Sequence, residues 1–212
     1  MVNNKVTIIN YNMGNLYSIE NAFNFIDCKT SITDNYDEIC NAKNLVLPGV
    51  GSFKKAMEKI KFKRIDQAIK KSISNGSKIL GICLGMQLLG KSSTEEELTY
   101  GLGLVDNEVL EFGKEEVANL KIPHVGFNSV KYDNKCKLFS NIKQNSDFYF
   151  VHSYRMKKLE TNTNEIYSYF NYGDDFIASI EKENIYGTQF HPEKESIKWT
   201  EIIKKFFKYL KC

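Results

Sequence analysis

The chain has 212 residues, of which 42% are hydrophobic and 26% are charged, which is typical of a globular protein with a sizeable core. Its net charge is only +3, and Arg64 and Arg155 are its only arginines, so composition argues against a nucleic-acid-binding protein. No apolar run approaches the roughly 20 residues that a membrane span needs, and the first ten residues lack a secretory signal's apolar core.

Cysteine and histidine usage also limits the possibilities. The cysteine count is odd and contains no C-x-x-C pair, which favours a reducing cytoplasm over a disulfide framework. The three histidines are far apart and form no H-E-x-x-H motif, so we expect neither a metal site nor a cofactor. The cysteines are Cys28, Cys40, Cys83, Cys136 and Cys212.

The first half of the chain alternates short apolar runs with helical patterns. An apolar run over 5–10 is followed by the loop "YNMGN" and by apolar residues at helical spacing from Leu16 to Ile26. A strand is predicted at 29–33, a buried strand running into the Gly-rich turn "PGVG" within 44–53, and another strand at 77–82. Helical patterns cover roughly 54–74, and residues 84–89 open a further helix. This alternation predicts βαβ units and a parallel sheet.

The second half is rich in aromatic, strand-like segments joined by short polar turns. A hairpin is predicted with its turn near Lys182–Asn184, and an amphipathic helix over 197–211. The other strand-like segments are "LVDNEVLEF", "HVGFNSVKY", "DFYFVHSYR" and "EIYSYFNY". We predict one α/β domain over residues 1–212, with a mixed sheet and an antiparallel extension.

Cys83 lies between two glycines in "GICLG", where a buried strand passes into a helix. Strand, G-x-C-x-G and helix in succession resemble a nucleophile elbow, in which a sharp turn lifts the side chain above the carboxyl edge of the sheet. The following helix start favours a thiolate. A buried structural cysteine beside a tight packing contact is the alternative.

A nucleophilic cysteine needs a base and a group that orients the base, and "QFHPE" contains both types. If this segment is extended, side chains two apart face the same way, so Glu193 would lie beside His191. The alternative for His191 is an ordinary surface residue at a strand end.

The turn "PGVG" follows a strand and should lie at the same sheet edge as Cys83. Its backbone N–H groups could stabilise an oxyanion together with the N–H that follows the nucleophile. A plain loop turn is the alternative, and phosphate binding is not favoured because no G-x-G-x-x-G or G-K-[ST] motif follows.

Together these blocks resemble the class I glutamine amidotransferases. "PGVGSF", "GICLGMQLL" and "GTQFHPEKE" match that family's three blocks in order and spacing, while "YNMGNLYSIENAF", "IPHVGFNSV" and "FYFVHSY" are similar to the glutaminase subunits of imidazole glycerol phosphate synthases. The resemblance covers nearly the whole chain. It implies a three-layer α/β fold, with a mainly parallel twisted sheet between helices.

The resemblance also implies roles for particular residues. Cys83 attacks the carboxamide of L-glutamine, His191 transfers the proton and Glu193 orients His191. Gly49, Gly51 and the Leu84 N–H form the oxyanion hole, and Gln87, His152, Ser153 and Tyr154 bind the substrate. The implied partner is a (β/α)8 barrel cyclase that receives ammonia through a channel, on a face that includes Asn15, Pro123, Phe127, Asn128 and Lys194.

Three positions depart from the family pattern. Asn10 stands where the family usually has Asp, Phe127 where it has Trp, and Glu195 where it has Ser. None belongs to the implied triad, but Phe127 lies beside the implied partner. A paralogous ammonia-supplying subunit of another route, such as cell-surface sugar amidination, therefore stays open beside histidine biosynthesis. A stand-alone cysteine hydrolase and a non-catalytic regulatory subunit are less consistent with the full motif set.

Overall fold

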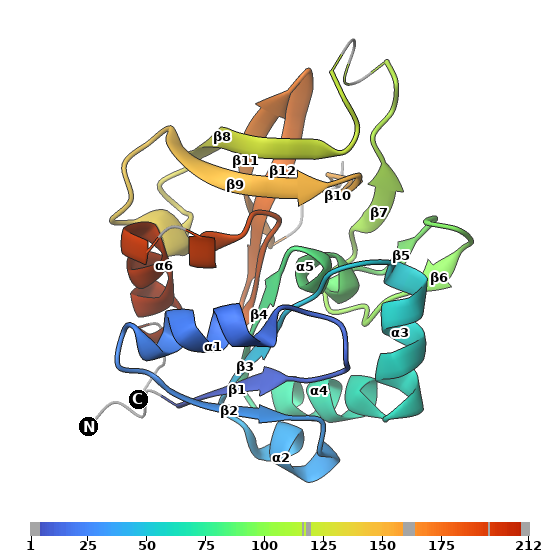
Figure 1. Cartoon of the computed structure of the whole chain (residues 1–212), viewed down its shortest axis with the longest axis vertical. Helices are drawn as coiled ribbons and strands as arrows, with labels where there is room; N and C mark the ends of the chain where they lie inside the picture. Colours follow the sequence, from blue (N-terminus) through green and yellow to red (C-terminus); the bar gives the residue numbers. More distant parts are fainter. Residues whose placement is uncertain (1–4, 116, 118–119, 159–163, 195, 209–212) are drawn as a thin grey trace.

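The computed structural model describes residues 5–115, 117, 120–158, 164–194 and 196–208. A nine-stranded sheet forms its centre, in the order β2-β1-β3-β4-β13-β12-β11-β8-β9 (Figure 1). The first five strands in this order are parallel: β2 (Lys29–Thr33), β1 (Lys5–Ile9), β3 (Asn44–Leu47), β4 (Lys78–Ile82) and β13 (Ile185–Thr188). The parallel sheet predicted from the alternating first half is therefore confirmed.

The other four strands form the predicted antiparallel extension: β12 (Asp174–Lys182), β11 (Ile166–Tyr172), β8 (His124–Tyr132) and β9 (Ser146–His152). Figure 1 shows β8 and β9 at the end of the molecule farthest from α2 (Tyr36–Asn41). A second, four-stranded sheet consists of β10 (Tyr154–Met156), β7 (Glu108–Glu111), β5 (Ser92–Ser93) and β6 (Thr99–Tyr100).

Helices cover both faces of the parallel strands. One hydrophobic cluster joins the sheet to α1 (Leu16–Asn24) and α6 (Ser196–Lys208), and the other joins it to α2, α3 (Phe53–Phe62), α4 (Ile65–Ser74) and α5 (Leu84–Leu89). Parallel strands buried on both faces read as continuous apolar runs, as "NLVL" and "KILGI" do. The result is the three-layer α/β fold expected from the sequence.

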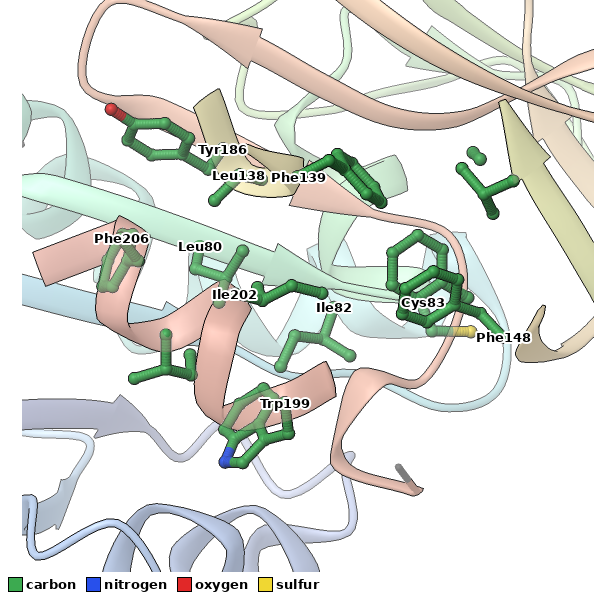
Figure 2. Close-up of a cluster of buried hydrophobic side chains, with 14 of the residues drawn as sticks. Leu80, Ile82, Cys83, Leu138, Phe139, Phe148, Tyr186, Trp199, Ile202 and Phe206 are labelled. Atoms are coloured by element: carbon green, nitrogen blue, oxygen red, sulfur yellow. The ribbon is translucent and has the colours of Figure 1, made fainter. Parts of the chain in front are cut away.

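Cys83 lies at one end of the first cluster, beside Phe148 (Figure 2). The cluster continues under β4 to Trp199 of α6, whose indole N–H donates to the carbonyl of Ala22 in α1 at 2.9 Å. The ring of Trp199 also meets Phe23 edge-on at 4.9 Å. Packing between α1 and α6 thus supports the sheet beneath the strand that leads to Cys83.

Some predicted elements differ from the observed ones. The helical patterns predicted over roughly 54–74 form two helices, and the break between them, where the chain turns at Arg64 with a φ of 58°, was not predicted. The strand predicted through "DFYFVHSYR" breaks at Ser153, where the chain leaves the large sheet and enters the small one. The helix α2 and the two-residue strands β5 and β6 were not predicted. Helix α6 matches the prediction up to Lys208, and the rest of 197–211 lies outside the described residues.

Across the residues that the structure describes, no helix has the length and apolarity of a membrane span.

Candidate active site

Three loops meet at the carboxyl edge of adjacent parallel strands. The "PGVG" turn follows β3, Cys83 follows β4, and His191 comes three residues after β13. The register aligns Leu47 with Gly81 and Thr188 with Ile82, so the three strands end at nearly the same level. Such an edge is where open α/β sheets bind ligands.

Cys83 occupies a sharp turn between β4 and α5. Its φ of 54° and ψ of −114° lie outside the regions that residues with a side chain normally adopt. The Cys83 N–H donates to the carbonyl of Thr188 at 2.8 Å, which ties the turn to β13. The residue is only 7% exposed and contributes to the wall of a cavity. The elbow predicted from G-x-C-x-G is therefore present.

The two flanking glycines are required by close backbone contacts. A Cβ at Gly85 would lie 1.7 Å from the carbonyl oxygen of Leu47, and one at Gly81 would lie 2.6 Å from the carbonyl oxygen of Gly85. Backbone atoms on both sides leave no room for a side chain to relax. The glycines therefore let α5 start directly against β3 and β4.

His191 and Glu193 are paired as predicted, although the extended conformation from which we predicted this pairing is wrong. His191 Nδ1 lies 2.8 Å from Glu193 Oε1. The segment is not extended, because β13 ends at Thr188 and Pro192–Lys194 form a short 3₁₀ turn. Proline, with its fixed φ and missing N–H, suits the first position of such a turn. The His191 N–H donates to Tyr149 O at 2.9 Å, which holds the turn against β9.

The environment of His191 favours its charged form. Burial by itself lowers the pKa of His191, but the Cys83 thiolate and the Glu193 carboxylate more than offset this and raise it to about 10. Nε2, the nitrogen not facing Glu193, is buried and makes no hydrogen bond of ordinary geometry within the described part of the chain. The arrangement is suited to a thiolate–imidazolium pair at neutral pH.

The "PGVG" turn lies beside the elbow, and a hydrogen bond from Tyr11 fixes its first residue. The buried Tyr11 hydroxyl donates to the carbonyl of Pro48 at 2.7 Å. Burial, and to a lesser extent the Cys83 thiolate, raises the pKa of Tyr11, so the hydroxyl stays a donor. Tyr11 was not identified from the sequence, since nothing in "IINYNMGN" distinguishes it from any other loop tyrosine.

A cavity of about 520 Å³ opens above Cys83. Its wall contains most of the residues predicted for the site, but Gly49 and Glu193 are not among the lining residues. The lining residues are Val50, Gly51, Ser52, Cys83, Leu84, Gln87, Glu95, Val151, His152, Ser153, Tyr154 and His191. Glu95 is the lining residue with a carboxylate, and the sequence could not select it from the run "EEE".

Glu95 is held in place by the neighbouring helix. Its Oε2 accepts the Phe53 N–H at the start of α3, at 2.9 Å. Burial raises the pKa of Glu95. The hydrogen bond from the Phe53 N–H lowers this pKa, and the negative charge of the neighbouring Glu96 raises it. The carboxylate thus contributes to the cavity wall from the loop between β5 and β6.

Gln87 and Gln189 form a buried amide pair under the cavity. Gln87 Nε2 donates to the carbonyl of Tyr154 and to Gln189 Oε1, each at 2.9 Å. Gln189 Nε2 in turn points at Cys83 Sγ at 3.8 Å. Both N–H groups of the Gln87 amide are therefore used within the protein, which leaves its carbonyl oxygen for a ligand.

The residues predicted to face a partner lie along connected elements. Asn15 caps α1, because its side chain accepts a hydrogen bond from the Ser18 N–H. Helix α1 contacts the Pro192–Lys194 turn, which carries Lys194, and this turn also contacts β9. The strand β8, paired with β9, carries Phe127 and Asn128 and follows Pro123. Phe127 is 61% exposed and meets Tyr149 edge-on. Of the departures from the family pattern, Glu195 lies outside the described residues.

A family model, glutamine amidotransferase class-I, matches residues 7–210. The chain belongs to this family. The amidotransferase is also similar to proteins named imidazole glycerol phosphate synthase subunit HisH. It is 40% identical to the one from Moorella thermoacetica over 95% of this chain and 93% of that protein. It is 42% identical to the one from Methanocaldococcus jannaschii over 97% of this chain and 100% of that protein.

Solved structures share the fold at low identity. PurLQS from Thermotoga maritima superposes with a TM-score of 0.72 at 19% identity, covering 98% of this chain and 99% of that one. A glutamine amidotransferase from the same organism gives a TM-score of 0.62 at 18% identity, covering 94% and 82%. At this level of sequence identity, these similarities support the fold of the amidotransferase alone.

We expect Gly85→Ala to destabilise the amidotransferase severely, by more than about 3 kcal/mol, because the new methyl group would overlap the Leu47 carbonyl. Urea denaturation followed by circular dichroism measures this. Gly76→Ala is the control: that site has open space around it and only a positive φ of 87°, so the cost should be about 1–2 kcal/mol. Equal unfolding midpoints for the two variants would contradict the close-contact interpretation.

Glu193→Gln should lower the pKa of His191, because the neutral amide keeps a hydrogen-bonding group but removes the negative charge. An NMR titration of ¹⁵N-labelled histidine measures the shift directly. Since the folded-state pKa is raised, the stabilisation from this pair is full below about pH 6.5 and is lost as pH rises toward 10 in the wild type. Glu97→Gln, an exposed charge change, is the control, and an unchanged His191 titration in Glu193→Gln would argue against the pairing.

Proposed function

We propose that this chain is the glutaminase subunit of an imidazole glycerol phosphate synthase. It hydrolyses L-glutamine to glutamate and ammonia, and the ammonia passes to a (β/α)8 barrel cyclase that forms imidazole glycerol phosphate and an aminoimidazole carboxamide ribonucleotide. The observation that carries the glutaminase part is the Cys83 elbow with the His191–Glu193 pair beside it at one cavity. The names of the relatives support the histidine route over a paralogous one.

In the first half-reaction the Cys83 thiolate attacks the carboxamide carbon of glutamine, and the carbonyl electron pair moves onto oxygen. The tetrahedral intermediate then collapses: the C–N bond breaks, and the His191 imidazolium donates a proton to the departing nitrogen, so that ammonia leaves. A thioester between Cys83 and the glutamyl group remains. Glu193 keeps the imidazole oriented and stabilises its charged form throughout.

In the second half-reaction water attacks the thioester carbonyl. Neutral His191 removes a proton from this water, the C–S bond breaks, and glutamate leaves while the thiolate–imidazolium pair is restored. Atoms balance as one glutamine and one water giving one glutamate and one ammonia. No external oxidant, reductant or cofactor is needed.

The oxyanion of both intermediates needs N–H donors beside Cys83. We assign this role to the Leu84 N–H, at the start of α5, and to the peptides between Gly49 and Gly51. Support comes from the position of the turn next to the elbow and from the Tyr11 hydroxyl that holds Pro48. Val50, between the two glycines, is 47% exposed at the cavity wall.

The cavity offers complementary groups for the rest of glutamine. The Glu95 carboxylate suits the substrate's α-ammonium group, and the free Gln87 carbonyl oxygen suits the NH₂ of the carboxamide. Main-chain groups at His152, Ser153 and Tyr154, where β9 ends and β10 begins, suit the α-carboxylate. This distribution would hold the carboxamide over Cys83 and the amino-acid end toward the small sheet.

We place the cyclase on the face formed by α1, the Pro192–Lys194 turn and the strands β9 and β8. The predicted contact residues Asn15, Lys194 and Phe127 lie along these elements. We further infer that residues 1–212 act as one amidotransferase domain, which the family match over 7–210 supports. The odd number of cysteines supports a reducing, cytoplasmic location.

Cys83→Ser should lower kcat for glutamine hydrolysis by at least about 10³-fold, since a hydroxyl is a far weaker nucleophile than a thiolate. Synthesis by the complex supplied with ammonium salts should continue, because the acceptor chemistry belongs to the partner. Cys40→Ser is the matched control, because Cys40 is a buried cysteine on α2 whose thiol faces the Ala68 carbonyl. The Cys40→Ser variant should retain glutaminase activity. Near-full glutaminase activity in Cys83→Ser would exclude the covalent mechanism.

We expect the chain alone to be a poor glutaminase that is activated by the cyclase carrying an acceptor analogue. The two glycines around Val50, with Gly51 at a φ of 98°, allow the peptides of the turn to reorient, and one missing oxyanion donor costs about 10²–10³ in rate. Glutamine hydrolysis is measured for the chain, for the complex, and for the complex with analogue. The kcat should rise by about 10² or more with little change in KM, and equal kcat values in all three would rule out the switch.

A further inference from the structure

Two buried histidines lie directly opposite each other on the antiparallel strands β8 and β9. His124 pairs with His152 in the strand register, and their rings meet with His124 Nδ1 at 3.4 Å from His152 Nε2. Both side chains are buried, and neither takes part in the mechanism above. They lie next to the point where the chain leaves β9 for β10.

The partners of His152 determine which nitrogen carries each proton. His152 Nδ1 lies 2.8 Å from the carbonyl oxygen of Tyr154, which can only accept, so Nδ1 carries the hydrogen. A neutral His152 then has a bare Nε2, which can only accept. His124 Nδ1 must therefore be the donor toward it.

The surroundings keep both rings neutral. Burial lowers the pKa of His124 to about 4. Burial also lowers the pKa of His152, to about 3; His124 and His191 lower it further, whereas the hydrogen bond to the Tyr154 carbonyl raises it. The His124 ring stacks on Phe170 with an interplanar angle of 10° and lies 4.1 Å from the ring of Tyr172. Its face is thus covered by aromatic rings, and its edge carries the polar contact.

The Tyr154 carbonyl links this pair to the catalytic groups. It accepts both His152 Nδ1–H and Gln87 Nε2–H. Gln87 also donates to Gln189, whose amide nitrogen points at Cys83 Sγ. A chain of hydrogen bonds therefore runs from His124 on β8 to the sulfur on the elbow, with Ser153 enclosed between His152 and Tyr154.

We propose that His124 is a positioning residue for glutamine: its Nδ1–H holds His152, and His152 holds the bend at Ser153 where the substrate's main-chain contacts lie. This inference rests on the proposed glutaminase function. Without the donor, His152 Nε2 would be left buried and unpaired. His152 would then rotate away or change tautomer, and the Tyr154 carbonyl would lose one of its two donors.

Two substitutions separate the donor from the ring. His124→Phe keeps an aromatic ring in the stack but has no N–H, whereas His124→Asn loses the ring but places an amide N–H near the position of Nδ1. Both are made in the full chain carrying Cys83→Ser, which prevents turnover, and L-glutamine binding is measured by NMR titration. We expect His124→Phe to weaken binding by about 10-fold or more, as loss of a buried hydrogen-bond partner does, and His124→Asn to bind within a few-fold of the parent.

A purely structural role predicts the reverse order, with His124→Asn the weaker binder, and that result would overturn the proposal. Equal affinity of His124→Phe and the parent would overturn it as well. Failure of the parent itself to bind L-glutamine would instead refute the proposed function, so the two failures are distinguishable.

The tautomers supply a second readout that needs no ligand. The chain has three histidines, so ¹⁵N ring spectra of the full-length protein are readily assigned by substitution. At neutral pH we expect His124 and His152 each to carry the proton on Nδ1, the tautomer less favoured in free imidazole side chains. His152 should change its signature in His124→Phe and keep it in His124→Asn. A parent spectrum with the His152 proton on Nε2 would overturn the hydrogen-bond direction and the proposal with it.

Discussion

The contact between Gly85 and the carbonyl of Leu47 is the constraint on which the site depends. At this point α5 begins with no space for a side chain between it and β3. The start of α5 also lies against the "PGVG" turn, since a Cβ at Gly49 would be 3.0 Å from the Gly85 nitrogen, and Cys83 directly before α5 has an unusual backbone conformation. The "PGVG" turn and Cys83 are thereby held at the ends of two adjacent strands, because the strands are parallel and end at the same edge.

The site contains two histidine environments with opposite electrostatics. His191 lies between a carboxylate and a thiolate, and these anions keep it charged despite burial. His124 and His152 are packed among aromatic rings, and burial keeps them neutral. In the proposed function, charge suits His191 as the group that would transfer protons, whereas neutrality suits the proposed role of His124 and His152 in holding a strand bend by directional hydrogen bonds. The same side chain thus serves two purposes because its surroundings differ.

Most of the fold could be predicted from sequence where the pattern is local and strong. The strand predicted at 29–33 and the strand-like segment at 124–132 have the bounds that the sequence suggested, and the helix predicted to open at Leu84 begins there. The break at Ser153 could not be predicted, since "FYFVHSYR" reads as one continuous strand and only its pairing with two different sheets divides it. Tyr11 and Glu95 were missed for the same reason: their significance lies in neighbours distant in the chain, Pro48 and Phe53.

The sequence by itself determined the α/β class, the elbow at Cys83 and the identity of the groups that pair around it, because glycine spacing and apolar periodicity act through nearby backbone. It also indicated that His191 and Glu193 belong together, although through an extended conformation that the structure replaces with a 3₁₀ turn. Only the tertiary structure decided which glutamate faces the cavity, which nitrogen of His152 carries its proton, and why His191 is charged. These properties depend on burial and on partners from other strands, which are absent until the chain is folded.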